Sequence, residues 1–303
     1  MRIGVLMGGR SLERDVSLRS GRRVSRALSE LDHDVLDLDV DERLDLVYIA
    51  LHGKFGEDGT VQELLEILDI PYTGPGVFSS AIGFNKALSK EIFRRENIPT
   101  PPFFVLSDAT FQEMGALHAL ESVGEKLGFP LVVKPAAQGS ALGVKVAASQ
   151  SDLPEAVRSA LHYDDRVLLE KFVSGTEVAA SILGNDILEA LPLVETVPRR
   201  DFFDFDARYT PGLTEYFCPA RLDDAVTQRV IDVALKTHRA LGCLNVSRVD
   251  IIVDHDGVPQ VLELNISPGM TETSLLPMAA EAAGMDFKKL VRRLLDLALE
   301  KYS

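Results

Sequence analysis

The stretch SRVDIIVDHDGVPQVLELNISPG (residues 247–269) holds two runs of alternating apolar residues on either side of Asp256-Gly257. An Asp-Gly pair between such runs is a strong signal for an antiparallel hairpin with a two-residue loop. Because side chains alternate between the two faces of a strand, the apolar residues of both runs should share one buried face. That face is predicted to contain Val249, Ile251, Val253, Leu262, Leu264 and Ile266.

The opposite face of the hairpin is polar. A two-residue loop pairs Asp250 with Glu263 and Arg248 with Asn265, and a four-residue loop would preserve the faces. Two carboxylates that face each other are destabilising without a positive charge between them, and Mg²⁺ takes carboxylate and amide oxygens as ligands. The pattern therefore predicts a divalent cation on Asp250, Glu263 and Asn265. Arg248 would face a phosphoryl or oxyanion charge; the alternative is a solvated acidic hairpin that this arginine balances.

The first eighty or so residues alternate between strand and helix patterns, which predicts a parallel, Rossmann-like sheet. Strands are expected over 2–7, 33–40 and 44–53, and helices over 16–31 and 60–69. In such a sheet, ligands bind outside the carboxyl ends of the strands. The residues expected at that rim are Gly8, Gly9, Glu13, His52 and Gly53.

The remainder of the chain has an α+β pattern. A single helix is expected over 79–97, then a small unit with strand-like runs that contain Lys134 and Lys171, and a mostly antiparallel region from about residue 175. The prediction is an α/β unit followed by α+β units. The expected domains are 1–84, 85–174 and 175–303.

Composition limits the possible partners of the protein. The 303 residues include 46 acidic and 32 basic ones, a formal net charge of −14, and no basic run that would attract nucleic acid or an anionic membrane. No segment is apolar for long enough to be a signal-peptide core or to span a bilayer, so a cytoplasmic protein is expected. The spacing of Cys218 and Cys243 suits neither a disulfide framework nor a zinc site.

Several other segments could carry chemistry, although each also has an ordinary structural interpretation. Lys134 precedes the Gly-rich loop in VVKPAAQGSALG (132–143), which could hold phosphates but lacks the order of a P-loop and could equally be a plain hairpin. Glu13 near a helix start could simply stabilise the helix dipole. The corresponding interpretations elsewhere are a turn or core histidine for His52, a loop aromatic for Tyr209, and surface salt bridges for Glu170, Lys171 and Glu177.

Taken together and in order, seven segments resemble the D-alanine–D-alanine ligase family of the ATP-grasp superfamily across nearly the whole chain. They are GGRSLERDVSLRSG (8–21), LHGKFGEDGTVQELLEILDIPYTGPG (51–76), VVKPAAQGSALGV (132–144), EKFVSG (170–175), FDFDARY (203–209), RVDIIVD (248–254) and LELNISPGMTETSLLPMAAEAAGM (262–285). The resemblance implies an ATP-grasp fold with an N-terminal parallel-sheet domain. It also implies two D-alanine molecules and ATP as substrates, two Mg²⁺ or Mn²⁺ ions, and a homodimer. The reaction in that family passes through an acyl phosphate, which the amine of the second D-alanine attacks.

The resemblance also assigns roles to residues. The residues expected around ATP are Lys86, Lys134, Gly139, Ser140, Glu170, Lys171, Val173 and Glu177. The first D-alanine is expected at Glu13 and His52, with Ser140 and Tyr209 in support, and the second at Ser274 and Leu275. Arg248 and the Gly269 amide should stabilise the acyl phosphate and oxyanion, while Asp250, Glu263 and Asn265 should hold the two metal ions.

Two positions depart from the family pattern, because Arg208 stands where lysine is frequent and Ala141 where a second serine is common. The closest alternative activity is a depsipeptide ligase that uses D-lactate, against which Tyr209 argues. A second alternative is a nucleotide-binding regulator without catalysis, and the presence of Arg248 and the metal ligands argues against it. The long loop over 198–217 is the candidate lid that keeps water from the acyl phosphate.

Overall fold

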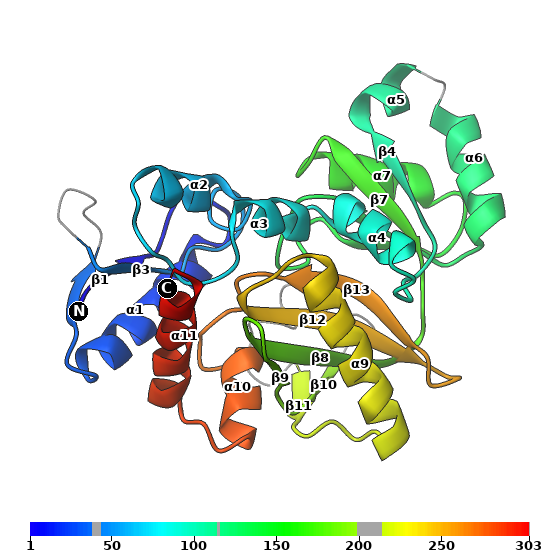
Figure 1. Cartoon of the computed structure of the whole chain (residues 1–303). Helices are drawn as coiled ribbons and strands as arrows, with labels where there is room; N and C mark the ends of the chain where they lie inside the picture. Colours follow the sequence, from blue (N-terminus) through cyan, green and yellow to red (C-terminus); the bar gives the residue numbers. More distant parts are fainter. Residues whose placement is uncertain (38–43, 114–115, 199–213, 303) are drawn as a thin grey trace.

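The computed structural model describes residues 1–37, 44–113, 116–198 and 214–302, which form three sheets with helices around them (Figure 1). The N-terminal unit contains β1 (Arg2–Leu6), α1 (Arg14–Ser29), β2 (Asp34–Asp37), β3 (Leu46–Ile49), α2 (Thr60–Ile67) and α3 (Val77–Phe84). Its strands are all parallel in the order β2-β1-β3, which confirms the predicted parallel sheet.

The predicted helix over 79–97 is two helices, and the single-helix prediction is wrong. α3 ends at Phe84 and α4 spans Lys86–Arg95, with Asn85 between them in an extended conformation. The side-chain oxygen of Asn85 accepts a hydrogen bond from the Leu88 amide, so this residue caps the second helix instead of continuing the first. The break places Lys86 in the first turn of α4, where its amide donates to the Ala136 carbonyl of the central unit.

The central unit is an antiparallel sheet in the order β4-β7-β5-β6, covered by helices on one side. Its elements are β4 (Phe103–Ser107), α5 (Asp108–Glu113), α6 (Ala116–Leu127), β5 (Leu131–Pro135), β6 (Lys145–Ala147), α7 (Leu153–Leu161) and β7 (Arg166–Lys171). The buried apolar residues of β5, β7, α6 and α7 form its core. The Gly-rich loop connects β5 to β6, and these two strands form a hairpin at the edge of the sheet.

The C-terminal sheet has the order β11-β10-β8-β12-β13, with β9 paired to β8. Its elements are β8 (Gly175–Gly184), β9 (Leu188–Ala190), β10 (Val194–Pro198), β11 (Thr214–Phe217), α9 (Asp224–Ala240), β12 (Asn245–Asp254), β13 (Pro259–Asn265), α10 (Leu275–Ala282) and α11 (Phe287–Lys301). The last four residues of the candidate lid over 198–217 are thus a strand, and residues 199–213 lie outside the described part of the chain.

The β12–β13 hairpin keeps the predicted pairing at its polar end, where Arg248 lies opposite Asn265 and Asp250 opposite Glu263. Nearer the turn the register shifts by one residue, so that Ile251 lies opposite Val261. The shift is a β-bulge, and it compensates for a loop one residue longer than predicted, in which the Asp254 amide donates to the Val258 carbonyl.

The bulge corrects one predicted core residue. Val261 is fully buried on the core face with Val249, Ile251, Val253, Leu264 and Ile266. Leu262 instead lines a cavity on the opposite face beside Glu263. A strict alternation from Leu264 back to Leu262 would have placed this leucine in the core, but the extra residue reverses the alternation at that point.

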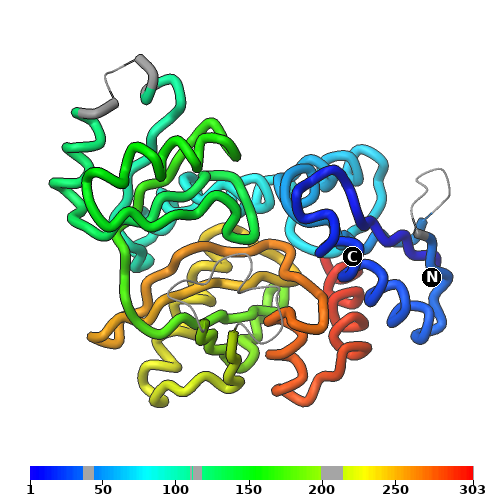
Figure 2. The backbone as a smooth tube through the Cα atoms, turned by 180° about the vertical axis from the view of Figure 1, so that it is seen from behind, coloured from blue at the N-terminus to red at the C-terminus, as the bar shows by residue number. Residues whose placement is uncertain are grey.

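The three units are packed together. Helix α4 lies between the central sheet and the β12–β13 hairpin, and the two views show the C-terminal helix α11 beside α1 of the N-terminal unit (Figures 1 and 2). One apolar core runs from Ile3 and Val5 in β1 to Leu290 and Leu294 in α11. Among the described residues no helix has the length and apolar character needed to cross a membrane.

Candidate active site

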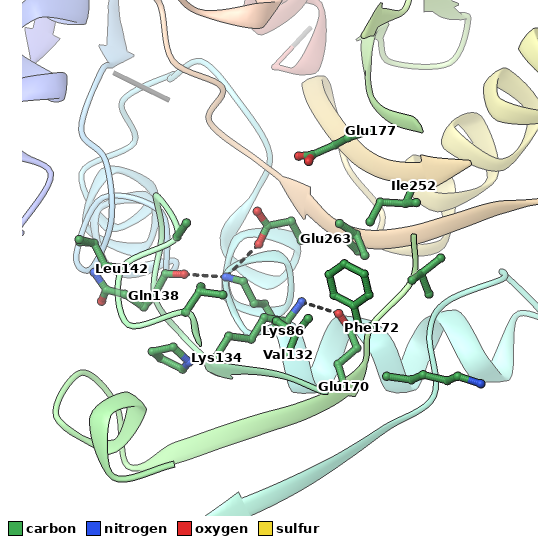
Figure 3. Close-up of a pocket in the computed structure, with 16 residues that line it drawn as sticks. Lys86, Val132, Lys134, Gln138, Leu142, Glu170, Phe172, Glu177, Ile252 and Glu263 are labelled. Carbon is green, nitrogen blue, oxygen red and sulfur yellow. Dashed lines mark hydrogen bonds and ion pairs between the residues drawn. The ribbon is translucent and has the colours of Figure 1, made fainter. Parts of the chain in front are cut away.

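A cavity between the central sheet and the β12–β13 hairpin is lined by residues of both (Figure 3). It encloses about 750 Å³, part of which is open to solvent. Val132, Leu142, Phe172, Ile252 and Leu262 supply apolar surface, while lysines and carboxylates stand around it. A cavity lined by apolar side chains and by lysines suits a nucleotide, which has an apolar base and anionic phosphates.

Lys134 lies on β5 beside Glu170 of β7, a consequence of the antiparallel pairing of those strands. The Lys134 Nζ donates to Glu170 Oε1 over 2.9 Å, and both side chains are almost fully buried. Lys90 of α4 makes a second ion pair with Glu170. Burial alone would raise the pKa of Glu170, but Lys134 and Lys90 hold it below the usual value, so the carboxylate is charged.

Lys86 connects the Gly-rich loop to the hairpin. Its Nζ lies 2.6 Å from the Gln138 carbonyl oxygen and 3.0 Å from Glu263 Oε2, and Figure 3 shows the ammonium between the two. This contact requires that α4 begin at Lys86 and that Glu263 lie on the cavity face of β13. Lys86 therefore stands at the junction of the loop, the hairpin and the cavity.

Arg248 and Asp250 lie on the same face of β12, two residues apart. The guanidinium makes a bidentate pair with the carboxylate, from Nε to Oδ1 over 2.7 Å and from Nη2 to Oδ2 over 2.9 Å. Asn265 donates its amide nitrogen to Asp250 Oδ2 over 3.0 Å. The structure therefore brings together the four polar residues that the hairpin pattern predicted, with Glu263 in the next ladder position.

The donor set of this face is two carboxylates and an amide. Among the described residues no group of three or more His, Cys, Asp and Glu side chains is arranged to hold a metal ion. The oxygens of Asp250 and Glu263, with the Asn265 amide oxygen, are nevertheless hard ligands of the kind that Mg²⁺ takes when substrate phosphates complete its shell. The residues present therefore fit a divalent cation that arrives with a nucleotide.

Glu13 is 5% exposed and lies immediately before α1. Its side chain does not cap that helix; the Ser140 hydroxyl of the Gly-rich loop donates to its Oε1 instead. The other oxygen, Oε2, is buried and has no hydrogen-bond partner within the described structure. Burial and the charge of Glu57 raise the pKa of Glu13 above its usual value. A buried carboxylate oxygen in this state is a site for a cation or a hydrogen-bond donor from a ligand.

The glycines around Glu13 have a steric reason. A Cβ on Gly53 would approach Glu13 Oε2 to 2.6 Å and one on Gly139 to 2.5 Å, so a larger residue at either place would displace the Glu13 carboxylate. Ser140 and Ala141 both have positive φ angles, of 52° and 56°, which is uncommon for residues with a side chain. The loop therefore stores local strain at the position where the Ser140 hydroxyl reaches Glu13.

His52 is buried at the carboxyl end of β3. Its Nδ1 lies 3.6 Å from Glu57 Oε1 and its Nε2 lies 3.4 Å from the Ser20 hydroxyl. Burial would lower the pKa of His52, but the hydrogen bond and charge of Glu57, with the charge of Glu13, raise it above the usual value. Arg248 acts in the opposite direction on the same imidazole, which shows that the N-terminal rim and the hairpin meet here.

The loop after β13 and the start of α10 form the remaining wall. Ser274 is the N-terminal cap residue of α10, and its Oγ accepts from the Thr271 amide over 3.0 Å. A Cβ on Gly269 would lie 2.8 Å from that same oxygen, so the loop passes closely over the helix start. Leu275 is buried in the core below, so its contribution at the surface is its backbone.

The structure also places the other predicted nucleotide residues. Val173 and Glu177 line the cavity, whereas the Lys171 side chain is exposed although its residue borders the same space. Tyr209 and Arg208 lie outside the described residues. Sequence reasoning did not single out Lys90 and Glu57, although Lys90 follows Lys86 by one helical turn and Glu57 belongs to the quoted segment 51–76.

Comparison with known proteins agrees with this arrangement. Two family models match, the D-Ala D-Ala ligase C-terminus over residues 92–296 and the D-Ala D-Ala ligase N-terminus over residues 35–75. A D-alanine–D-alanine ligase from Desulforamulus reducens is 45% identical over 311 residues, covering 99% of both chains. The one from Moorella thermoacetica is 43% identical and covers 99% of this chain and all of that protein.

Solved structures are similar as well. The D-alanine–D-alanine ligase from Bacillus anthracis superposes with a TM-score of 0.86 at 36% identity, covering 99% of this chain and 98% of that one, and has also been solved with ATP. The VanG D-Ala:D-Ser ligase from Enterococcus faecalis has a TM-score of 0.86 at 27% identity, with 98% and 99% covered.

Two antiparallel sheets that enclose a cavity lined by lysines and apolar side chains, beside a parallel N-terminal sheet, define a ligase of the ATP-grasp fold. Family models that match more than half of the chain, and full-length relatives above 40% identity, identify it further. The chain belongs to the D-alanine–D-alanine ligase family.

Proposed function

We propose that the protein joins two D-alanine molecules to D-alanyl-D-alanine at the expense of ATP, for peptidoglycan precursor synthesis. The observation that carries this proposal is the buried Glu13 carboxylate, whose Oε2 has no hydrogen-bond partner among the described residues, next to the loop that borders the cavity of Figure 3. An amino acid supplies the cation that this oxygen lacks. The relatives of the chain, named D-alanine–D-alanine ligases, support the identity of that amino acid.

The nucleotide lies in the cavity of Figure 3 under this proposal. Its base packs against the apolar wall that includes Phe172, Ile252 and Leu262, and Glu177 accepts from the ribose. Lys86, Lys134 and the backbone amides of residues 139–143 lie toward the phosphates. Phosphoryl transfer needs positioning and charge neutralisation more than covalent help, and this set of groups provides both.

The first D-alanine binds with its ammonium at Glu13 and its carboxylate toward the γ-phosphate. Ser140 and His52 hold Glu13 and the rim in place, and Tyr209 belongs to this group by resemblance. Attack of the substrate carboxylate on the γ-phosphate releases ADP and leaves an acyl phosphate. Arg248 and the Gly269 amide stabilise the charge on that acyl group.

The second D-alanine binds at the start of α10. Helix N-termini favour anions, so the substrate carboxylate lies at the backbone of Ser274 and Leu275. Its amine, once deprotonated, attacks the acyl carbon, and collapse of the tetrahedral intermediate expels phosphate. One D-alanyl-D-alanine, one ADP and one phosphate result from each turnover.

Asp250, Glu263 and Asn265 are proposed to hold two Mg²⁺ ions, or Mn²⁺. Bound ions of this kind neutralise phosphate charge and orient the γ-phosphoryl group. Arg248 and Lys86 pair with the carboxylates of Asp250 and Glu263, so both acids already lie beside positive charge. The chemistry of the donor set, oxygen only and incomplete by itself, supports magnesium over zinc.

A homodimer is proposed for the assembly. The exposed faces of the contacting helices α2 and α3 carry large apolar side chains, with Leu64 49%, Ile67 73% and Phe78 74% exposed. Apolar groups of this size on a surface favour protein contacts. Light scattering should give twice the chain mass for the homodimer, and a Phe78→Glu variant should give a smaller mass.

A cytoplasmic location is proposed as well, because the reaction consumes ATP.

The proposed activity is tested by ADP release with Mg-ATP and D-alanine, alongside L-alanine and an equimolar mixture of D-alanine and D-lactate. Product masses identify what has formed. ADP that depends on D-alanine, with D-alanyl-D-alanine as the product, is the expected result. A depsipeptide as the main product, or magnesium-dependent ATP binding without turnover, would contradict the proposal.

A further inference from the structure

Lys90 is a lysine that the proposed function leaves without a role, and it is fully buried. It lies on α4 one helical turn after Lys86, between the central sheet and the hairpin. Its ammonium forms an ion pair with Glu170 and a hydrogen bond with the Thr100 hydroxyl. A buried lysine is costly unless it is paired, so its presence at this point needs a reason.

The charges around Lys90 do not cancel. Lys90 and Lys134 both pair with the single carboxylate of Glu170, and the nearby Glu263 carboxylate pairs with Lys86. Three ammonium groups therefore stand against two carboxylates, an excess of one positive charge among these described residues. This excess lies at the wall of the nucleotide cavity, to which Lys86, Lys134 and Glu170 all belong. An anion in the cavity would complete the balance.

Lys90 also connects the two sheets that enclose the nucleotide. Thr100, which it contacts, donates from its hydroxyl to the Val261 carbonyl over 2.7 Å, and the Val261 amide donates to the Pro99 carbonyl over 2.8 Å. Val261 lies at the bulge of β13, two residues before Glu263. The ammonium of Lys90 is thus linked to the phosphate side through Glu170 and to the metal-binding strand through Thr100.

We propose that Lys90 is a positioning residue for the nucleotide: it shares the Glu170 carboxylate so that Lys134 can donate to a phosphate oxygen, and it supplies the excess positive charge. The proposal rests on the proposed function of the cavity. Without Lys90, Lys134 would be the only close cation of Glu170 among the described residues. The Lys134–Glu170 pair would then be neutral, and Glu170 would hold the Lys134 ammonium away from the phosphate.

The surroundings of Lys90 predict a pH dependence. The groups that face it are Glu170 on β7, Lys134 on β5, Glu263 on β13, Thr100, and the Phe103 ring of β4, which Arg94 also faces. Burial lowers the pKa of Lys90 to about 8 against the opposing effect of Glu170. The charge is therefore present below pH 8 and lost above it, so nucleotide affinity should fall as the pH rises through this value.

The test is calorimetric titration with Mg²⁺ and the non-hydrolysable analogue AMP-PNP. Lys90→Met removes the charge at nearly constant volume, Lys90→Arg keeps it at all accessible pH values, and Lys126→Met removes an exposed lysine of the same unit as the matched control. Lys134→Met tests the cavity itself. We expect Lys90→Met to weaken binding roughly tenfold or more and Lys126→Met less than about twofold.

Two further readouts separate positioning from general destabilisation. Lys90→Met should raise KM for ATP with little change in KM for D-alanine, and Lys90→Arg should lose the weakening of binding above pH 8. If Lys134→Met weakens binding while Lys90→Met does not, the Lys90 proposal is overturned and the nucleotide site stands. If neither variant weakens binding, both are overturned. Should Lys90→Met fail to fold, an alkaline loss of affinity that is equal in wild type and Lys90→Arg would overturn the proposal.

Discussion

The two ends of the proposed site each contain a buried carboxylate, but the two carboxylates have different partners. At the nucleotide end, the Glu170 carboxylate has two lysine partners, and its pKa is held below the usual value. At the proposed amino-acid end, Glu13 is almost as buried, but a serine hydroxyl donates to one oxygen and no described residue forms a hydrogen bond with the other, and its pKa is raised. Glu170 lines the cavity of Figure 3, and Glu13 is held by Ser140 of the loop that borders this cavity.

This difference follows from what each end must bind. A triphosphate is an anion, and under the proposal its phosphates lie near Lys134 and Lys90, which Glu170 holds in position. An amino acid presents an ammonium, and under the proposal it binds at the Glu13 carboxylate, which has no direct ion pair among the described residues and is costly to bury. The ion pairs of Glu170 are therefore expected to compensate for its burial, whereas the burial of Glu13 is expected to lower the free energy of unfolding.

The largest expected effect is on catalysis. Glu13→Gln keeps the shape and the Ser140 contact but removes the charge, so kcat/KM for D-alanine should fall about 100-fold or more. Binding of Mg²⁺ and AMP-PNP should change less than about twofold, because the nucleotide end keeps its own charges. Glu63→Gln, an exposed acid of the same unit, is the matched control. Equal losses in nucleotide binding and in D-alanine use would remove the distinction between the ends.

A smaller effect tests the bulge that shapes the nucleotide wall. Val261→Ala should cost about 2 kcal/mol of unfolding free energy, because this side chain is fully buried in the core. Leu262→Ala should cost less than about 1 kcal/mol but raise KM for ATP severalfold, because Leu262 lines the cavity. Urea unfolding and initial rates measure the two quantities. A larger loss of unfolding free energy in Leu262→Ala than in Val261→Ala would place Leu262 in the core and would contradict the bulge.

The third effect is a pH dependence with opposite signs at the two ends. Because the pKa of Glu13 is raised, this acid takes up a proton early as the pH falls, and kcat/KM for D-alanine should drop about tenfold per pH unit below that pKa. The folding penalty of Glu13 is relieved in the same range. Glu170, with a lowered pKa, contributes stability that persists until the pH falls through its folded value. As the control, kcat/KM of Glu13→Gln for D-alanine should not fall in this way at acidic pH.

The sequence predicted the pairing at the polar end of the hairpin, because two alternating runs around Asp-Gly leave few registers. It missed the bulge, because an extra residue in the loop and one in the strand cancel at Asp250 and Glu263 and leave the motif unchanged. The break at Asn85 was also missed, since an uninterrupted helical pattern on both sides hides a side-chain cap.

Burial and partners were the other part that patterns could not supply. Periodicity alone does not say whether Lys90 faces solvent or a carboxylate from another sheet, since its partner Glu170 lies eighty residues further along the chain. Glu13 has an ordinary place near a helix start, and only the fold brings Gly53, Gly139 and Ser140 against it. The family resemblance indicates Glu13, Gly139, Ser140 and Glu170 as site residues, but it does not indicate Lys90.

The most direct test of the central comparison is the stability of two matched variants without ligands. Glu170→Gln leaves two buried lysines with no counter-charge, and it should lower the unfolding temperature by roughly 5 °C or more at pH 7. Glu13→Gln removes a buried charge for which burial and Glu57 outweigh the nearby cations His52 and Lys86, and its unfolding temperature should equal or exceed that of the wild type. A loss in Glu13→Gln as large as that in Glu170→Gln would mean that the chain already balances Glu13, and it would contradict the account.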